Sequence, residues 1–138
     1  MWRWSKVTGT SNGPSENQHQ MAVIKWTQQA GIRRKWPELS LLHHIPNERL
    51  CTQRQGKMLK LMGVKRGVPD LFLPVPRGRY HGLWIEMKTE TGSTTDDQEW
   101  WGEHLLSQGY MWEVCHGWQS AVRILEWYMG LSTGGEHA

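Results

Sequence analysis

The sequence predicts one α/β domain in which helices flank a small mixed β-sheet. Two observations indicate this fold class. Segments with apolar residues three to four positions apart, typical of helices, alternate with short apolar runs of strand length. The 138 residues suffice for one hydrophobic core but are too few for two domains. We expect a flexible N-terminal arm, the folded domain and a polar tail, over residues 1–14, 15–131 and 132–138.

Capping signals mark the expected helices. Two pairs of residues have the spacing of a capping box, in which the N-cap residue and the third helical residue bond each other's backbone N–H. These pairs are Ser15 with Gln18, and Thr95 with Gln98. The expected helices cover residues 16–30, 52–62, 95–107 and 118–129. Because Gly31 follows the first helix, the basic cluster Arg33-Arg34-Lys35 is expected on a loop.

Short apolar runs bounded by turn residues mark the expected strands. The runs 69–74 and 80–88 are separated by the turn 75–79 and should form a hairpin. A third strand is expected over residues 110–115. The run 39–45 suits either a strand or a helical turn, and its length does not decide between the two.

The composition is that of a soluble protein with a mild excess of positive charge. A net charge of +3 and a pI of about 9.0 permit a phosphate-rich partner without requiring one. Most of the ten tryptophans should pack in the core and at its rim, and a few exposed ones could stack on bases. No apolar run reaches the roughly 18 residues of a membrane span. Cys51 and Cys115 lack metal-ligand spacing, which predicts free thiols in a reducing cytoplasm.

The most informative residues are Asp70, Glu86 and Lys88, which lie on the two strands of the predicted hairpin. Glu86 and Lys88 are two positions apart and therefore share a face. Pro69 has no N–H, which favours a strand start and lets the backbone beside Asp70 open. Two carboxylates on paired strands can bind one hard cation such as Mg²⁺ or Mn²⁺. The alternative is an ion pair on a half-exposed sheet.

These groups suit the hydrolysis of a phosphodiester. A cation would polarise the phosphate and activate a water molecule, and Lys88 could orient that water or offset charge on the phosphate. This chemistry needs no covalent intermediate. The adjacent His43 and His44 do not indicate a zinc site, because neighbouring strand residues face opposite sides of the sheet.

In these and further motifs the chain resembles the VRR-NUC (virus-type replication-repair nuclease) domain of the PD-(D/E)xK nuclease superfamily, in its stand-alone, phage-like form. The resemblance extends from Glu16 to Leu131. The motifs that carry it are the helix with Glu16, residues 44–47, residues 63–71 with Gly-Val-Pro-Asp, residues 82–88 with Ile-Glu-Met-Lys, Gln98, and Gly109-Tyr110. The resemblance implies a restriction-endonuclease-like core.

The resemblance also implies a role for each site residue. The implied catalytic residues are Asp70, Glu86, Lys88, Gln98 and Glu16. Asp70, Glu86 and the backbone carbonyl of Met87 are implied to bind Mg²⁺ or Mn²⁺. Gln98 would support the site, and Glu16 from the first helix would complete it. Both have another explanation, since Gln98 fits a capping role and Glu16 fits the preference for acids in a first helical turn.

DNA is the substrate that the resemblance implies. Contacts to phosphate are expected from basic residues next to the two strands, namely Lys65, Arg66, Arg77 and Arg79. Stand-alone members of the family are similar to phage-borne DNA-repair enzymes that act as homodimers on branched DNA such as four-way (Holliday) junctions. We therefore expect an endodeoxyribonuclease in the cytoplasm of a bacterial host, with no membrane partner and no nucleotide cofactor. Two alternatives stay open: a non-cleaving DNA-binding module, and a sequence-specific restriction-type endonuclease.

Overall fold

The structure of the chain is a computed structural model that describes residues 13–46 and 52–133. Its elements are, in chain order, the helices α1 (Glu16–Thr27) and α2 (Ala30–Lys35), the 3₁₀ helix η1 (Pro37–Leu41), β1 (His43–His44), α3 (Gln53–Leu61), β2 (Leu71–Leu73), β3 (Leu83–Lys88), α4 (Asp96–Ser107), β4 (Met111–His116) and α5 (Trp118–Met129).

The strands form a mixed sheet in the order β1-β2-β3-β4. The predicted hairpin is confirmed, because β2 and β3 pair in antiparallel orientation. β4 lies parallel to β3 on its other side, and α4 forms the crossover connection that a parallel pair requires. β1 extends the sheet by pairing antiparallel to β2. The predicted fold class, a small mixed sheet flanked by helices, is therefore confirmed.

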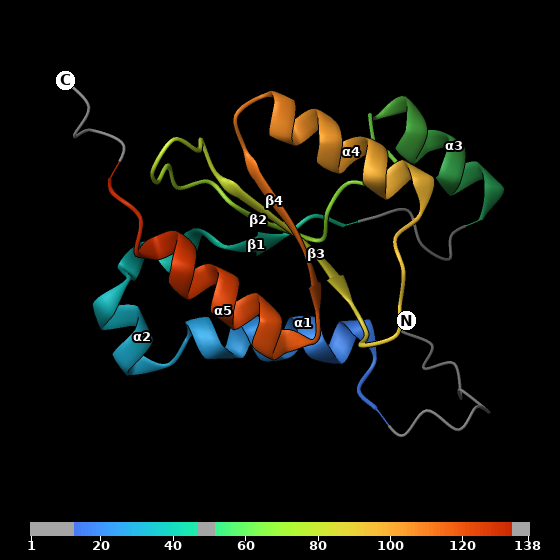
Figure 1. Cartoon of the computed structure of the whole chain (residues 1–138). Coiled ribbons are helices and arrows are strands. Elements are labelled where there is room, and N and C mark those ends of the chain that lie inside the picture. Colours follow the sequence, from blue (N-terminus) through green and yellow to red (C-terminus); the bar gives the residue numbers. More distant parts are fainter. Residues whose placement is uncertain (1–12, 47–51, 134–138) are drawn as a thin grey trace.

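Helices cover both faces of the sheet (Figure 1). α1 and α5 pack on one face, and α4 packs on the other. The main core lies on the α1 and α5 side and includes Val23, Leu71, Leu73, Leu83, Ile85, Met87, Cys115 and Leu125. Strand residues alternate between faces. Glu86 and Lys88, which lie between core positions, therefore project on the α4 side of β3.

Aromatic side chains and a glycine set the distance between α4 and the sheet. Phe72 stacks on Trp84 with ring centroids 4.1 Å apart. Gly102 of α4 lies directly against Trp112, since a Cβ atom at this glycine would come within 2.3 Å of the indole ring. α4 therefore approaches the sheet closely, and its first residues lie at the end of the sheet where β3 finishes (Figure 1).

The predicted capping boxes are confirmed, and a third begins α3. In each box the N-cap oxygen accepts the backbone N–H of the third helical residue, whose glutamine side chain accepts the N-cap N–H. The pairs are Ser15 with Gln18, Thr52 with Gln55, and Thr95 with Gln98. Gly109, just beyond α4, has the left-handed backbone (φ +86°) that its position predicted.

The prediction of one long first helix followed by a basic loop is wrong. α1 ends at Thr27, and the extended backbone of Gln29 (ψ 138°) separates it from α2. The Arg33 side chain donates a hydrogen bond to the Thr27 carbonyl at 3.3 Å, which satisfies one of the last carbonyls of α1. The basic cluster is therefore helical, and Gly31 lies inside α2 rather than ending a helix.

The segment left undecided between a strand and a helical turn contains both, as η1 followed by β1. The expected strands are confirmed, and none of their bounds shifts by more than three residues. Residues 1–12 of the predicted arm, residues 134–138 of the tail, and Cys51 lie outside the described residues. Cys115 is a buried free thiol. Within the described ranges, no helix combines the length and the apolar character needed to cross a membrane.

Two glycines test how closely α4 and α2 are packed. Gly102→Ala should lower the free energy of unfolding by about 1–3 kcal/mol, because its methyl group would overlap the Trp112 ring. Gly31→Ala should raise it by about 0.5–1 kcal/mol, because nothing lies within 4 Å of the new methyl group in α2. Urea unfolding curves measure both. Equal effects of the two variants would contradict the close approach of α4.

Candidate active site

Asp70 is held by groups from the chain segments on both sides of it. Its carbonyl oxygen accepts the N–H of Ile45 at 2.8 Å and lies 2.8 Å from Nδ1 of His44. A carbonyl oxygen can only accept, so Nδ1 of His44 carries the proton. The Asp70 carboxylate oxygen Oδ2 accepts the N–H of Met87 at 2.8 Å. Asp70 is therefore fixed between β1 and β3.

Glu86 and Lys88 lie beside Asp70. Leu71 pairs with Ile85 across the hairpin, and the next position along this register brings Asp70 opposite Glu86, where cross-strand side chains meet. The Lys88 ammonium nitrogen Nζ lies 3.6 Å from Oε1 of Glu86. The structure therefore brings together the two carboxylates and the lysine that the sequence singles out.

All three side chains are buried, which rules out the alternative of a surface ion pair. Asp70 is 6% exposed, Glu86 2% and Lys88 5%. Two carboxylates with one ammonium leave a negative charge uncompensated when all three are ionised. Burying such a charge is costly unless a further positive group reaches it.

The electrostatics of the site act most strongly on Glu86. Burial and, after it, the negative charge of Asp70 raise the pKa of Glu86 from 4.5 to about 8, although the positive charge of Lys88 partly opposes the shift. The oxygen Oε2 of Glu86 is buried and has no hydrogen-bond partner among the described residues. Buried polar atoms in folded proteins almost always have a partner. Oε2 is therefore an acceptor available to a ligand.

Pro69 alters the hydrogen bonding of β3 next to the carboxylates. In an antiparallel pair, a bonded residue directs its N–H and its carbonyl to the same side of the strand. The Met87 N–H points to Asp70, so the Met87 carbonyl points to that side too. The register places Pro69 opposite Met87, and proline has no N–H to donate. The Met87 carbonyl therefore faces the carboxylates without a donor from Pro69.

The other two predicted site residues, Gln98 and Glu16, have no direct hydrogen bond to this cluster among the contacts of the described residues. Oε1 of Gln98 accepts the N–H of Thr95 at 2.9 Å, so its capping role is observed. Glu16 is exposed in the first turn of α1, where an acid favours the helix dipole. Its charge is nevertheless among those that raise the pKa of Glu86. The starts of α1 and α4 both lie at the end of the sheet where β3 finishes (Figure 1).

The comparison with known proteins agrees with this geometry. The sequence profile of the VRR-NUC domain matches residues 14–119. The chain belongs to the VRR-NUC family. A solved structure described as a "VRR_NUC domain protein" is similar in fold, with a TM-score of 0.76 and 30% sequence identity over 89% of this chain and 94% of that chain. No curated protein matches the sequence. The domain is thus a member of a nuclease family.

Lys65 and Arg66 of this VRR-NUC domain lie next to the end of the sheet that carries the acidic cluster. Both are exposed, and they precede Asp70 by only a few residues. The indole N–H of Trp101 donates to the carbonyl of Arg66 at 2.9 Å. At Gly67 (φ +86°) an added Cβ would come within 2.6 Å of the α4 backbone. The segment that carries the two basic residues is therefore anchored to the start of α4.

The structure does not bring Arg77 and Arg79 to the carboxylates. Both lie on the hairpin turn, at the opposite end of β2 and β3 from Asp70 and Lys88. Arg77 is half-buried, and its guanidinium lies 3.8 Å from a Glu38 carboxylate oxygen. The position of these two arginines therefore does not support their predicted role in binding phosphate at the acidic cluster.

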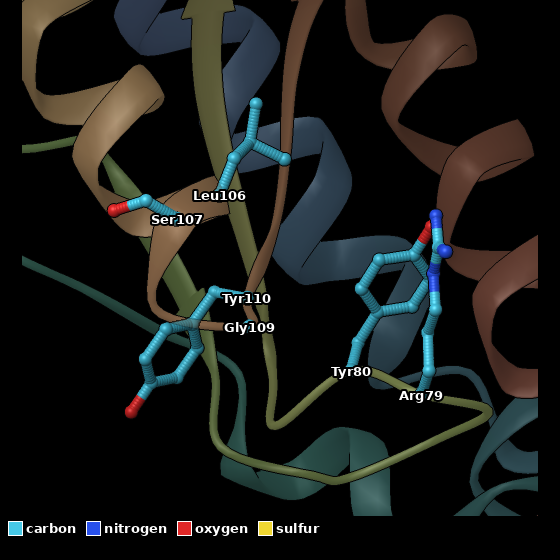
Figure 2. A pocket seen from close by; sticks show the side chains of 6 residues that line it. All are labelled: Arg79, Tyr80, Leu106, Ser107, Gly109 and Tyr110. Carbon is cyan, nitrogen blue, oxygen red and sulfur yellow. The ribbon is translucent and has the colours of Figure 1, made fainter.

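Arg79 borders a hollow at this far end of the sheet (Figure 2). The hollow has a volume of about 450 Å³. The residues that line it are Arg79, Tyr80, Leu106, Ser107, Gly109 and Tyr110. It lies where α4 leads into β4 and is separate from the acidic cluster, which lies at the other end of these strands.

His44 is the site residue whose function the sequence did not reveal. Its position in the sequence argues against a zinc site and matches a family motif, whereas in the structure its ring fixes the Asp70 carbonyl. The pairing of His44 with Leu71 produces this contact, and a two-residue strand gives too short a pattern to predict it. No group of three or more His, Cys, Asp or Glu side chains in the described ranges could hold a metal. A cation at this site would therefore need backbone or water ligands as well.

The raised pKa of Glu86 predicts how stability changes with pH. Between pH 4.5 and about 8, Glu86 is ionised in the unfolded chain but keeps its proton in the folded protein. The folded state then binds more protons, so this residue makes stability fall as pH rises through that window.

Glu86→Gln removes the buried charge while keeping the side-chain shape. With a chelator present, the variant should lose less stability than wild type between pH 5 and pH 8. At pH 8 it should be more stable by about 1–3 kcal/mol. Urea unfolding at several pH values measures this, with the exposed Glu90→Gln as the matched control. Identical pH profiles for wild type and Glu86→Gln would refute the raised pKa.

Proposed function

We propose that this VRR-NUC protein is a Mg²⁺- or Mn²⁺-dependent endodeoxyribonuclease that cleaves branched DNA, such as four-way junctions, as a homodimer. One observation carries the proposal: Asp70, Glu86 and Lys88 are buried together at one end of the sheet. Family membership supplies the nuclease class. The metal, the branched substrate and the dimer go beyond it.

The donor atoms at this end of the sheet fit a hard divalent cation. Oε2 of Glu86 is a buried acceptor with no partner among the described residues. Oδ2 of Asp70 is bonded to the Met87 N–H, which leaves Oδ1 to act as a ligand. The Met87 carbonyl faces the same space. Carboxylate and carbonyl oxygens are the ligands that Mg²⁺ and Mn²⁺ prefer. We assign the metal site to Asp70, Glu86 and the carbonyl of Met87.

The reaction then follows from the positions of the side chains. A cation bound here would polarise the scissile phosphate and lower the pKa of a water molecule. The Lys88 ammonium, 3.6 Å from Glu86, is placed to orient the attacking water or to offset charge that develops on the phosphate. Asp70 keeps its orientation because the Met87 N–H and the groups on its carbonyl hold it in place. In this proposal water attacks phosphorus directly while the bond from phosphorus to one sugar oxygen breaks, and that oxygen leaves with a proton, so no covalent enzyme intermediate forms.

Lys65 and Arg66 are proposed to guide the DNA backbone to this site. They are exposed beside the start of α4, next to the strand that carries Asp70. Contacts between basic side chains and phosphates position DNA without recognising its sequence. Gln98 is assigned a supporting role through its cap of α4. Glu16 acts through its charge, which reaches Glu86.

A two-fold dimer suits paired cuts in a branched substrate. A domain with one site makes one cut, and two symmetric cuts need two sites related by a two-fold axis. The rival reading, a DNA-binding module that does not cleave, gives no reason to bury two carboxylates beside a lysine. A restriction-type enzyme would prefer one duplex sequence, whatever the shape of the DNA.

Removal of either carboxylate or of the lysine should abolish cleavage. Asp70→Ala and Lys88→Met should each lower the cleavage rate of a labelled four-way junction in Mg²⁺ or Mn²⁺ by roughly 100-fold or more, since Asp70 would hold the cation and Lys88 would offset charge on the reacting phosphate. Arg123→Ala, an exposed change on α5, is the matched control and should cleave like wild type.

The same assay on flaps, linear duplex and single strands separates the alternatives. Equal product from wild type and Asp70→Ala would refute the site assignment. Salt-sensitive binding without cleavage of any DNA would support the non-cleaving module. A single preferred duplex sequence would support the restriction-type enzyme.

A further inference from the structure

α3 presents an apolar stripe to solvent instead of to the body of the protein. Met58, Leu61 and Met62 are spaced three and four residues apart, so they lie on one face of the helix. They are 56%, 84% and 72% exposed. Gly56, the buried residue of α3, lies on the opposite face. Folded proteins rarely leave large apolar side chains grouped in water unless a partner covers them.

On α3 itself, the charges beside this stripe are all positive. Arg54, Lys57 and Lys60 are exposed on α3, which has no acidic residue. The helix therefore offers a basic, apolar surface. A partner for it needs apolar side chains that are ringed by acids.

The outer face of α4 has these properties. Its inner face packs on the sheet through Gly102 and Leu105. On the other side of the helix, Trp100 is 53% exposed and stacks on His104, with ring centroids 4.0 Å apart. α4 has no lysine or arginine, and all of its acidic residues are exposed: Asp96, Asp97, Glu99 and Glu103.

We infer that α3 of one copy of the chain packs on the outer face of α4 of a second copy, and that the second copy does the same in return. This inference rests on the proposed homodimer and names its surface. A two-fold axis makes such an exchange self-complementary, because each copy supplies one basic and one acidic helix. Opposite charges across an interface favour this arrangement over other pairings.

The two faces do not satisfy each other within one chain. In the described residues, the large apolar side chains on these two faces remain exposed. In the described part of the chain, no ion pair joins the two helices.

DNA is a poor partner for the combined surface. The acids of α4 would repel phosphates, and apolar side chains gain nothing from contact with a charged backbone. A second copy of the chain satisfies both helices.

The arrangement also bears on the two active sites. The segment from α3 to β2 leads directly to Asp70 and carries Lys65 and Arg66. An interface on α3 and α4 therefore places both copies of this segment next to the dimer contact. The two nuclease sites of the dimer would then lie at a fixed distance from each other and could act on one DNA molecule.

Charge reversal tests the surface directly. The α3 variant is Arg54→Glu with Lys57→Glu, and the α4 variant is Asp96→Lys with Glu103→Lys. Alone, each variant brings like charges together at both contacts of the dimer. A one-to-one mixture restores opposite charges at both contacts.

Sedimentation velocity measures association, and thermal melts confirm that each variant folds. Wild type should sediment as a dimer, each variant should raise the dimer dissociation constant at least tenfold, and the mixture should recover the dimer. Trp100→Lys should also weaken the dimer. Trp127→Lys, on the similarly exposed tryptophan of α5, is the matched control and should not.

Other outcomes would overturn the inference in distinguishable ways. A monomeric wild type would refute the homodimer itself. A dimer that the folded variants leave intact would refute this surface but not the homodimer. Variants that dimerise normally but bind DNA more weakly would assign α3 to DNA instead. If a monomeric protein still cleaves DNA, the proposed nuclease activity stands although the dimer does not. Asp70→Ala should still form dimers, because Asp70 lies outside the proposed interface.

Discussion

The structure depends on one electrostatic constraint: two carboxylates face each other across β2 and β3 in a buried place, with one lysine beside them. At ordinary pKa values this cluster would carry excess negative charge where water cannot screen it well. The Lys88 ammonium offsets part of this negative charge. The raised pKa of Glu86 offsets another part, because the protonated carboxyl group is neutral. The same preference for positive charge that raises the pKa of Glu86 would favour a cation in place of its proton. A metal-dependent nuclease needs such a preference at its active site.

The surrounding elements hold the cluster in this arrangement. β1 fixes the backbone of Asp70 from one side, and the Met87 N–H fixes its carboxylate from the other. Pro69 interrupts the ladder at the position where its N–H would otherwise face the Met87 carbonyl. The close approach of α4 at Gly102 covers the face of the sheet that carries the charges. The main core, on the opposite face, is thereby separated from the polar site.

Much of this could be predicted from the sequence, because the relevant signals are local. Capping boxes involve residues three apart, and a hairpin joins neighbouring runs, so the starts of α1 and α4 and the pairing of β2 with β3 followed from the sequence. The break between α1 and α2 did not, because it depends on the extended backbone of Gln29 and on a hydrogen bond from Arg33. The short strand β1 exists only because β2 pairs with it.

The candidate site shows the same limit. The strand spacing, Pro69 and the family resemblance together pointed to Asp70, Glu86 and Lys88, but only their burial in the structure excludes a surface ion pair. The cap formed by Gln98 is observed, whereas its supporting role in the site stays a prediction. Arg77 is predicted to contact DNA, yet it lies beside Glu38, 39 residues earlier in the chain. Long-range pairs of this kind leave no local pattern. The contact of His44 with Asp70 was missed for the same reason.

The central claim is that the two buried carboxylates form a metal site while the lysine serves the reaction. Calorimetric titration of the protein with Mn²⁺ tests it most directly, with Glu86→Gln, Asp70→Asn and Lys88→Met measured beside wild type. We predict that wild type binds Mn²⁺, that both carboxylate variants lose most of this affinity, and that Lys88→Met keeps it or binds more tightly. Unchanged Mn²⁺ binding by Glu86→Gln and Asp70→Asn would contradict the account.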